Sequence, residues 1–481
     1  MRLLRFAAPL IAAPVLAAAA QQPLTLADAI ALAQKQGYLG QQAIAARDAA
    51  RARDHAFGAR LLPQLTLSGQ APAYQRSITP VIQPDGTTLF TPLQTTDALV
   101  SAKVSQQIPF TGGTFSVSSS LDRLQVTGAQ QVQTWTTNPV VVSLSQDILR
   151  PNRVKWDTRE QDVSAEYAER QYIEAREDVA LQTANAYFGL YAAKMSLENA
   201  KSNAGINDTL YTLNKGRFEV GKIGENDLLQ SELALLRARA TLDGAKLDYD
   251  RALSALRLAV NVPAGQDIEV TAPSDIPTFD PDTTLAVQQA HENRAQVLLT
   301  ELANVRAKRR VTEAKLNNGI GATVDASLGF NSTAPDMNAA YRNLLQQQRF
   351  TLGVSMPIVQ WGAHSGDVQA AQADQRGAEA AARASGEQIA QDAKYAALQL
   401  SQARRNVALS AKADTVAAKR FDVAYARYVI GKIGVDNLYI AQNEKDSAMQ
   451  QYVQALRGYW TAYFALRKAT GYDFDKGAPI R

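Results

Sequence analysis

Few side chains in this sequence could carry out a reaction. The chain has no cysteine and only three histidines, His55, His291 and His364, which lie far apart among ordinary helix or loop residues. No local His-x-x-x-His or mixed histidine and carboxylate spacing is present, so we expect no metal site. A Gly-x-Ser-x-Gly elbow and a phosphate-binding loop are also missing. The sequence therefore indicates neither an enzyme nor a protein with a cofactor.

The most specific pattern is the tetrapeptide Gly-Lys-Ile-Gly, which occurs at 221–224 and again at 431–434. A gapless comparison of residues 217–229 with 427–439 gives six identities in thirteen positions. The constant offset of 210 residues indicates an internal duplication. Acidic residues follow the tetrapeptides, and their simplest explanation is a favourable interaction with the start of a helix.

Each tetrapeptide has the glycine spacing of a turn between two helices. The first glycine suits a left-handed C-terminal cap, and the second suits an N-cap. The second turn has Asn437 where the first has Asp227, so it lacks a carboxylate at the third helical position. We therefore expect the second turn to be the looser one.

Long helices are predicted on both sides of each turn. Downstream of the turns, small residues recur every seven positions, from Ser231 to Ala259 and from Ala441 to Ala469, and most have a large residue three positions earlier. This spacing is typical of closely packed coiled-coil helices. Proline is absent between 151 and 263 and between 357 and 479. We predict two helical hairpins, at 152–262 and 365–471, which are too long for a compact core.

The segments between the helical regions alternate apolar and polar residues. This period of two, seen for example from Val100 to Ser105 and from Phe350 to Met356, predicts strands at about 64–148 and 323–359. The pattern suits a transmembrane barrel and equally suits an antiparallel sheet on a core. We favour the barrel, because long rods offer the strands little to pack on.

The number of strands stays open between two alternatives. We count four to six strands per chain, fewer than the eight of the smallest barrels, so closure requires several chains. An added pair at Ala98 to Ile108 and Thr114 to Leu124 either lengthens an extracellular loop or enlarges the barrel. Three chains would then give twelve or eighteen strands. We prefer twelve, because both copies of the duplication then contribute equally.

The organisation of the chain follows from these patterns. Residues 1–20 are typical of a secretory signal, with Arg2 and Arg5 before an apolar run. A first repeat is expected at 21–263, a proline-rich linker at 264–282, and a second repeat with a C-terminal tail at 283–481. Each repeat begins with a predicted helix, Leu26 to Arg60 or Leu285 to Asn317. These helices align without gaps.

Charge and hydropathy narrow the class further. No apolar run outside the signal approaches 18 residues, so insertion into a membrane is expected through strands only. The formal net charge is +4, which gives no support for a nucleic-acid partner. Because the chain has no cysteine, we expect no lipid anchor on an N-terminal cysteine.

With its two matched turns and the strands between them, the mature sequence resembles the TolC-type outer membrane factors, the outer membrane efflux protein family. In that family each turn has a glycine, a small or hydroxyl residue three positions on, an aspartate six on, and then leucine. The matching residues here are Gly221, Gly224, Asp227, Leu228 and Gly431, Gly434, Asn437, Leu438. The resemblance implies a mainly α protein with a shared membrane β-barrel and a periplasmic tunnel of coiled-coil hairpins, built as a homotrimer.

The resemblance also implies roles for the turns. Family members often carry acidic rings at the closed end of the tunnel, although the second turn here departs from that pattern at Asn437 and Ile440. The candidates for a negatively charged aperture that favours cations are Glu225, Asp227, Asp436 and Asn437. The candidates for contact with a periplasmic adaptor protein are Val220, Gly221, Lys222, Gly224, Ile430, Gly431, Lys432 and Gly434. The lysines have a simpler explanation as residues that keep an exposed turn soluble.

The implied function is a passive, gated exit duct of a tripartite efflux or type I secretion system, located in the outer membrane and extending through the periplasm. Its energy would come indirectly from an inner-membrane pump of the RND or ABC type. The alternative is a periplasmic adaptor with coiled-coil hairpins. The sequence leaves the cargo open among drugs, metal ions, small metabolites and proteins.

Overall fold

A computed structural model describes residues 23–127, 131–263, 265, 268–271, 276–277 and 279–481. The predicted signal at 1–20 lies outside these residues. The chain divides into two compact units. The first unit contains residues up to 44, 173–290 and 392–481, and the second contains 45–172 and 291–391. The protein is mostly helical, with one large sheet.

The helices form two series with the same order and the same lengths. Helices α1 (Leu26–Gln36) and α5 (Thr283–Asn293) have 11 residues each, α2 (Tyr38–Arg60) and α6 (Ala295–Asn317) have 23, α3 (Arg153–Glu219) and α8 (Ala363–Val429) have 67, and α4 (Glu225–Val260) and α9 (Val435–Thr470) have 36. Within the described part of the chain, no helix combines the length and the apolar character needed to cross a membrane.

The helix expected over Leu26 to Arg60 is interrupted at Gly37. This residue is extended, with φ −64° and ψ 150°. A Cβ atom at Gly37 would lie 2.5 Å from the backbone oxygen of Ala259 in α4, so the close approach of α4 leaves room only for glycine. The second series is interrupted at the equivalent place by the extended residue Arg294.

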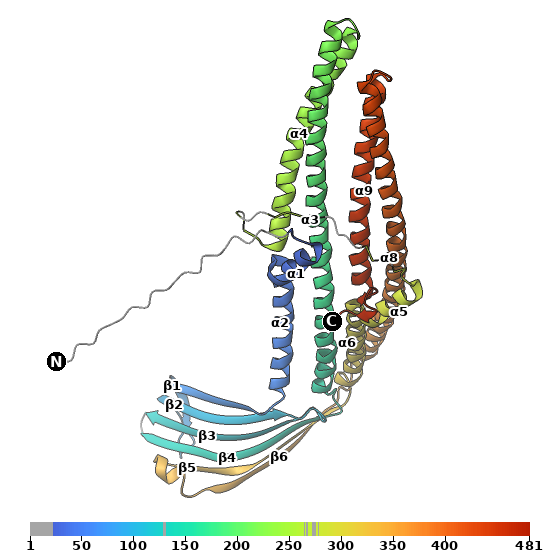
Figure 1. Cartoon of the computed structure of the whole chain (residues 1–481). Helices are drawn as coiled ribbons and strands as arrows, with labels where there is room; N and C mark the ends of the chain where they lie inside the picture. Colours follow the sequence, from blue (N-terminus) through green and yellow to red (C-terminus); the bar gives the residue numbers. More distant parts are fainter. Residues whose placement is uncertain (1–22, 128–130, 264, 266–267, 272–275, 278) are drawn as a thin grey trace, which may run out of the picture. The chain divides into compact units, whose positions relative to one another are not determined.

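Two helical hairpins dominate the first unit, α3 with α4 and α8 with α9 (Figure 1). The residues of the seven-residue stripe face the interior of this unit. Ser231, Ala245, Ala441 and Ala448 are buried, and the other small residues of the stripe are at least half-buried. Large residues three positions earlier, such as Leu438, are likewise covered. A short pair of strands, β7 (Tyr472–Asp473) and β8 (Ala478–Pro479), follows α9.

A six-stranded antiparallel sheet forms most of the second unit. Its strands are β1 (Gln64–Ile82), β2 (Thr88–Gln107), β3 (Thr114–Thr127), β4 (Val132–Ile148), β5 (Gly321–Ala334) and β6 (Leu345–Ser355), with the one-turn helix α7 (Met337–Ala340) between the last two. Each strand pairs with the next in sequence, and the sheet is bent into an arc (Figure 1).

The strand count corrects one expectation. We preferred four strands per chain on the ground that the two halves contribute equally, but the first half supplies β1 to β4 and the second only β5 and β6. The added pair forms β2 and β3, which hydrogen-bond to each other and to their neighbours along their length. Their alternating side chains let them extend the sheet instead of forming a loop outside it.

Candidate functional site

The two Gly-Lys-Ile-Gly turns have the same backbone geometry. Gly221 and Gly431 have φ of 70° and 75°, the left-handed region that residues with a Cβ avoid. The amide after each glycine bonds back to the last helical turn, at 2.8 Å from Lys222 to Arg217 and at 2.8 Å from Lys432 to Arg427. This is a Schellman-type cap. The predicted conformation of the first glycine in each turn is therefore confirmed.

The second glycine of each turn begins the next helix. Gly224 and Gly434 are N-caps with φ of −79° and −75°, and neither supplies a side-chain hydrogen bond. The acids that follow therefore lie close to uncapped amides. In the first turn these acids are Glu225 and Asp227, and in the second turn only Asp436.

An apolar cluster in the first unit packs the two hairpins together near these turns. Leu210 of α3 packs with Phe421 and Tyr428 of α8 and with Val435 and Leu438 of α9. The second turn is therefore flanked by residues that pack against α3 of the first hairpin. Sequence comparison found the paired turns but gave no sign that they lie against each other.

Polar contacts cross the same junction. The Tyr428 hydroxyl donates a 2.6 Å hydrogen bond to Oδ1 of Asn214, which is fully buried. The Arg217 guanidinium lies over the Tyr428 ring, 5.3 Å from its centroid, and donates to the Val429 carbonyl oxygen at 3.0 Å. Nε2 of Gln230 donates to the Asp436 carboxylate at 2.6 Å.

These contacts frame a groove of about 550 Å³ that both hairpins line. The first hairpin contributes Arg217, Lys222, Ile223 and Asp227, and the second contributes Tyr428, Val429, Ile430, Gly431, Ile433, Gly434, Val435 and Asp436. Of the four aperture candidates, the structure thus brings Asp227 and Asp436 into one groove, whereas Glu225 and Asn437 are exposed beside it.

The candidates for adaptor contact divide in a similar way. Lys222, Ile430, Gly431 and Gly434 line the groove, while Val220, Gly221, Gly224 and Lys432 are exposed on the turns without lining it. The contributions of Asn214 and Gln230 were missed, because nothing in their spacing marks them. Arg217 and Tyr428 fall inside the aligned segments, but their roles depend on the partner hairpin.

Further along the same helices, a seam of amides lies between α3 and α9. Asn199 and Asn203 donate to the two oxygens of the Asp446 carboxylate at 2.8 and 2.7 Å. Several polar atoms here are buried and have no hydrogen-bond partner, among them Oδ1 of Asn207 and Oε1 of Gln442. This contact between α3 and α9 is polar, whereas the cluster near the turns is apolar.

Tyr439 lies one turn after the second glycine turn and packs against the apolar cluster. Its hydroxyl is buried without a hydrogen-bond partner. Burial, with a smaller contribution from Tyr428, raises the pKa of Tyr439 to about 12. The neutral form is therefore the one compatible with the packed tip.

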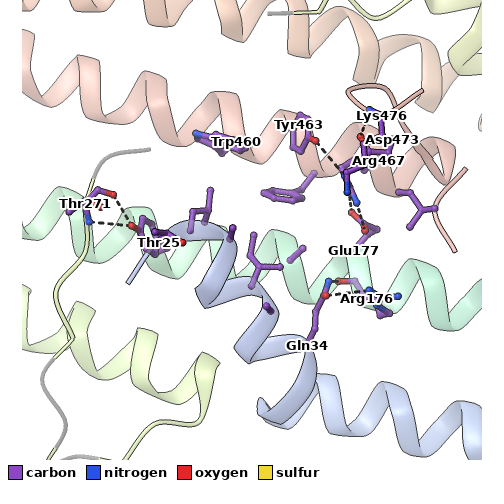
Figure 2. A pocket seen from close by; sticks show the side chains of 18 residues that line it. Thr25, Gln34, Arg176, Glu177, Thr271, Trp460, Tyr463, Arg467, Asp473 and Lys476 are labelled. Atoms are coloured by element: carbon purple, nitrogen blue, oxygen red, sulfur yellow. Dashed lines mark hydrogen bonds and ion pairs between the residues drawn. The ribbon is translucent and has the colours of Figure 1, made fainter. Parts of the chain in front are cut away.

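A second concavity of about 610 Å³ lies elsewhere in the first unit, among α1, α3 and α9 (Figure 2). Its charged wall is a closed network, in which Arg467 bonds to both oxygens of Glu177 at 2.8 and 3.1 Å and to Asp473 at 2.5 Å. Burial by itself lowers the pKa of Arg467, but the bonds to Glu177 and Tyr463 outweigh it, and the pKa is raised. This network is suited to holding the end of α9 in place.

The described residues near the turns offer contacts to a partner and not a cluster of metal ligands. No group of three or more histidine, aspartate or glutamate side chains with the geometry of a metal site occurs in the part of the chain that the structure describes. The groove at the tip offers charge, apolar contact and exposed backbone. Such a surface can bind a partner and can influence ions.

The fold is similar to those of several solved channels. The outer membrane channel CmeC of Campylobacter jejuni has 17% identity and a TM-score of 0.67, with 95% of this chain and 87% of that one covered. VceC of Vibrio cholerae has 15% identity and a TM-score of 0.66, covering 93% and 96%. The open state of MtrE of Neisseria gonorrhoeae has 16% identity and a TM-score of 0.62, covering 93% and 88%. No curated protein matches the chain.

The family model for outer membrane efflux proteins matches residues 93–262 and 286–472. These ranges include both long hairpins and most of the sheet. The chain belongs to the outer membrane efflux protein family. It is an exit duct of the outer membrane, and the adaptor alternative is not supported.

Proposed function

We propose that three copies of this chain form a gated duct whose closed end is the tip made by the two glycine turns. The observation that supports this most directly is that both turns of one chain meet in a single groove, held by the bond between Tyr428 and Asn214. A gate needs two elements whose separation changes the opening. The two hairpins also contact each other along α3 and α9, through Asn199 with Asp446 and through Glu177 with Arg467, so the gate would open by separation of the hairpins near the turns.

The aperture would be controlled by charge. Asp227 and Asp436 lie in the groove, and three copies place several carboxylates around one axis. Glu225 and Asn437, exposed beside the groove, complete the proposed ring of aperture residues. A ring of carboxylates favours cations and repels anions.

Opening would follow from binding of a periplasmic adaptor at the exposed turns. The contact residues are Val220, Gly221, Lys222 and Gly224 of the first turn and Ile430, Gly431, Lys432 and Gly434 of the second. Val220 is 67% exposed and Ile430 65% exposed, so each turn presents a large apolar side chain to solvent. An adaptor that binds the separated hairpins better than the packed ones shifts the population toward the open state.

The transport energy would come from an inner-membrane pump of the RND or ABC type that the adaptor connects to the duct. The duct itself has no proposed reaction and no cofactor. The two equal helix series support an origin by internal duplication.

Photo-crosslinking in cells tests this function. A photoreactive amino acid at Val220 or Ile430 should give an adduct with a periplasmic adaptor, identified by mass spectrometry. The control position is Leu247 in the middle of α4, which is 52% exposed but distant in sequence from both turns. Equal adducts at Leu247, or none at either turn, would overturn the proposed contact. Mass photometry of the purified particle gives the number of copies independently.

A further inference from the structure

The six-stranded sheet carries two continuous rows of side chains on opposite faces. Residues paired across neighbouring strands form a row across the sheet, and one such row is apolar on five strands. The next row, shifted by one residue along each strand, is polar on all six. The apolar row is Leu65, Val104, Val117, Val142 and Leu328, and the polar row is Gln64, Ser105, Ser116, Ser143, Ser327 and Arg349. A second apolar row, through Phe115, Leu144, Ala326 and Phe350, reaches β6.

The apolar rows face outward into solvent in the single chain. Leu65 is 74% exposed, Leu328 52% and Phe350 72%. A sheet with one apolar and one polar face, at successive positions of every strand, is typical of a wall between lipid and water. Both β2 and β3 carry the first apolar row and the polar row, whereas in the second apolar row β2 has Gln106 paired with Phe115.

The turn between β2 and β3 lies at the end of the sheet that adjoins α3 in the second unit. Ile108 and Gly113 close the turn with a 2.8 Å backbone hydrogen bond. The Asn152 side chain, just before α3, donates to the carbonyl oxygens of Pro109 and Phe110 at 2.9 and 3.1 Å. The turn between the added strands therefore lies at the same end of the sheet as the start of β1 and the end of β4. The added strands are not confined to the other end of the sheet.

The outer edges of β1 and β6 have no strand partner in the described chain. Backbone groups on such edges must be paired inside a membrane. Because the number of strands is even and every neighbour is antiparallel, β6 of one copy runs antiparallel to β1 of the next. Identical chains can therefore close the sheet on themselves without changing the pattern.

We infer that all six strands of each chain enter the outer-membrane wall, through pairing of β6 with β1 of a second copy, so that three copies form an eighteen-stranded barrel. This inference rests on the proposed assembly of three copies. With strands about 4.8 Å apart and tilted by about 40°, eighteen strands give a backbone diameter of about 36 Å, against about 24 Å for twelve. The lumen is polar, and barrels of 16 to 18 strands leave an aqueous channel.

The rival arrangement places β2 and β3 in a flap outside the membrane, with twelve strands in the wall. In a flap, both faces of β2 and β3 contact water, and the apolar row has no lipid to meet. The two arrangements therefore differ in the surroundings of Val104 and Val117. The surroundings of Val142, on β4, are the same in both.

Single cysteines distinguish the arrangements, because the natural chain has none. Val104→Cys, Ser105→Cys, Val117→Cys and Ser116→Cys probe the added pair, and Val142→Cys with Ser143→Cys are the matched controls. In intact outer membranes, a spin label at 104 or 117 should be accessible to oxygen in lipid, as at 142. A label at 105 should be accessible to a water-soluble nickel reagent, as at 143, whereas Ser116 is only 8% exposed and a label there should be less accessible. High nickel accessibility at 104 and 117 would overturn the inference.

Electron cryo-microscopy of the wild-type particle provides a second measurement, which requires no substitution. Eighteen strands in the wall support the inference. A particle of three copies with twelve strands overturns the inference and leaves the proposed duct intact, whereas a particle with another number of copies overturns the proposed assembly itself.

Discussion

The hydroxyl of Tyr428 in α8 lies 2.6 Å from Oδ1 of Asn214 in α3, and this buried hydrogen bond joins the two hairpins of one chain. We predict that Tyr428→Phe weakens the contact between the two hairpins. It leaves the fully buried Asn214 with fewer partners, at a cost of about 1–3 kcal/mol. Channel conductance in planar bilayers should rise. Tyr425→Phe removes a hydroxyl from the same cluster and should leave conductance unchanged. Equal effects from the two variants would contradict a specific role for this bond.

The carboxylates of Asp227 and Asp436 line one groove and should set ion preference. In the double variant Asp227→Asn, Asp436→Asn we expect weaker preference for cations, because the negative potential at the proposed aperture falls. Reversal potentials in asymmetric salt measure this preference. The matched control is Asp243→Asn, on an exposed part of α4, where the carboxylate pairs with Lys246. An unchanged reversal potential in the double variant would remove these residues from the aperture.

The left-handed glycine of the second turn should accept a side chain only with a loss of stability. Gly431→Ala places a Cβ at φ 75°, which costs about 1–2 kcal/mol. Gly434→Ala has φ −75° and open space around the added atom, so it should cost much less. The midpoint temperature of thermal unfolding of the purified protein compares the two. Equal midpoints would show that the conformation of Gly431 is not required.

The Arg467 network should be among the most stabilising polar features of the first unit. Glu177 and Asp473 have side chains only 4% and 7% exposed, and Arg467→Met leaves both without their cation. Breaking such a buried network costs about 3–5 kcal/mol. Arg251→Met removes an exposed arginine 3.9 Å from Asp248 and should change stability little. Denaturant midpoints measure both variants, and similar midpoints would argue against the network.

The buried hydroxyl of Tyr439 gives a prediction about pH. Burial raises the pKa of Tyr439 from its ordinary value of 10.0 to about 12, so folding favours the neutral phenol. Its contribution to stability is complete below pH 10 and is lost as the pH rises toward 12. Tyr439→Phe cannot ionise and should lose less stability over that interval. At pH 7 it should be at least as stable as the wild type, because it removes an unpaired buried hydroxyl. Thermal midpoints at pH 7 and pH 11 test both statements.

Much of the fold follows from local patterns in the sequence. The seven-residue stripes and the long proline-free regions indicated the hairpins, and alternation indicated strands at the positions of all six. The glycine turns could be predicted in detail, because φ, capping and residue type are local properties. The break at Gly37 was not predicted, and the need for glycine there depends on the approach of Ala259, which is distant in sequence.

The candidate site was less accessible from sequence. Asp227 and Asp436 could be named from their place after each turn, but their meeting in one groove depends on how two hairpins pack. Asn214 and Gln230 act only through partners on the other hairpin. The added pair of strands was recognised from its alternation, but the preference for four strands per chain was wrong, because it assumed equal contributions from both halves.

The unequal strands and equal helices have an evolutionary consequence. A hairpin such as β2 and β3 starts and finishes at the same end of the sheet. Its gain or loss therefore does not change the direction of any later strand. The rods that follow keep their lengths and their turns. A lineage can therefore alter the width of the sheet in steps of two strands while the two glycine turns are inherited unchanged.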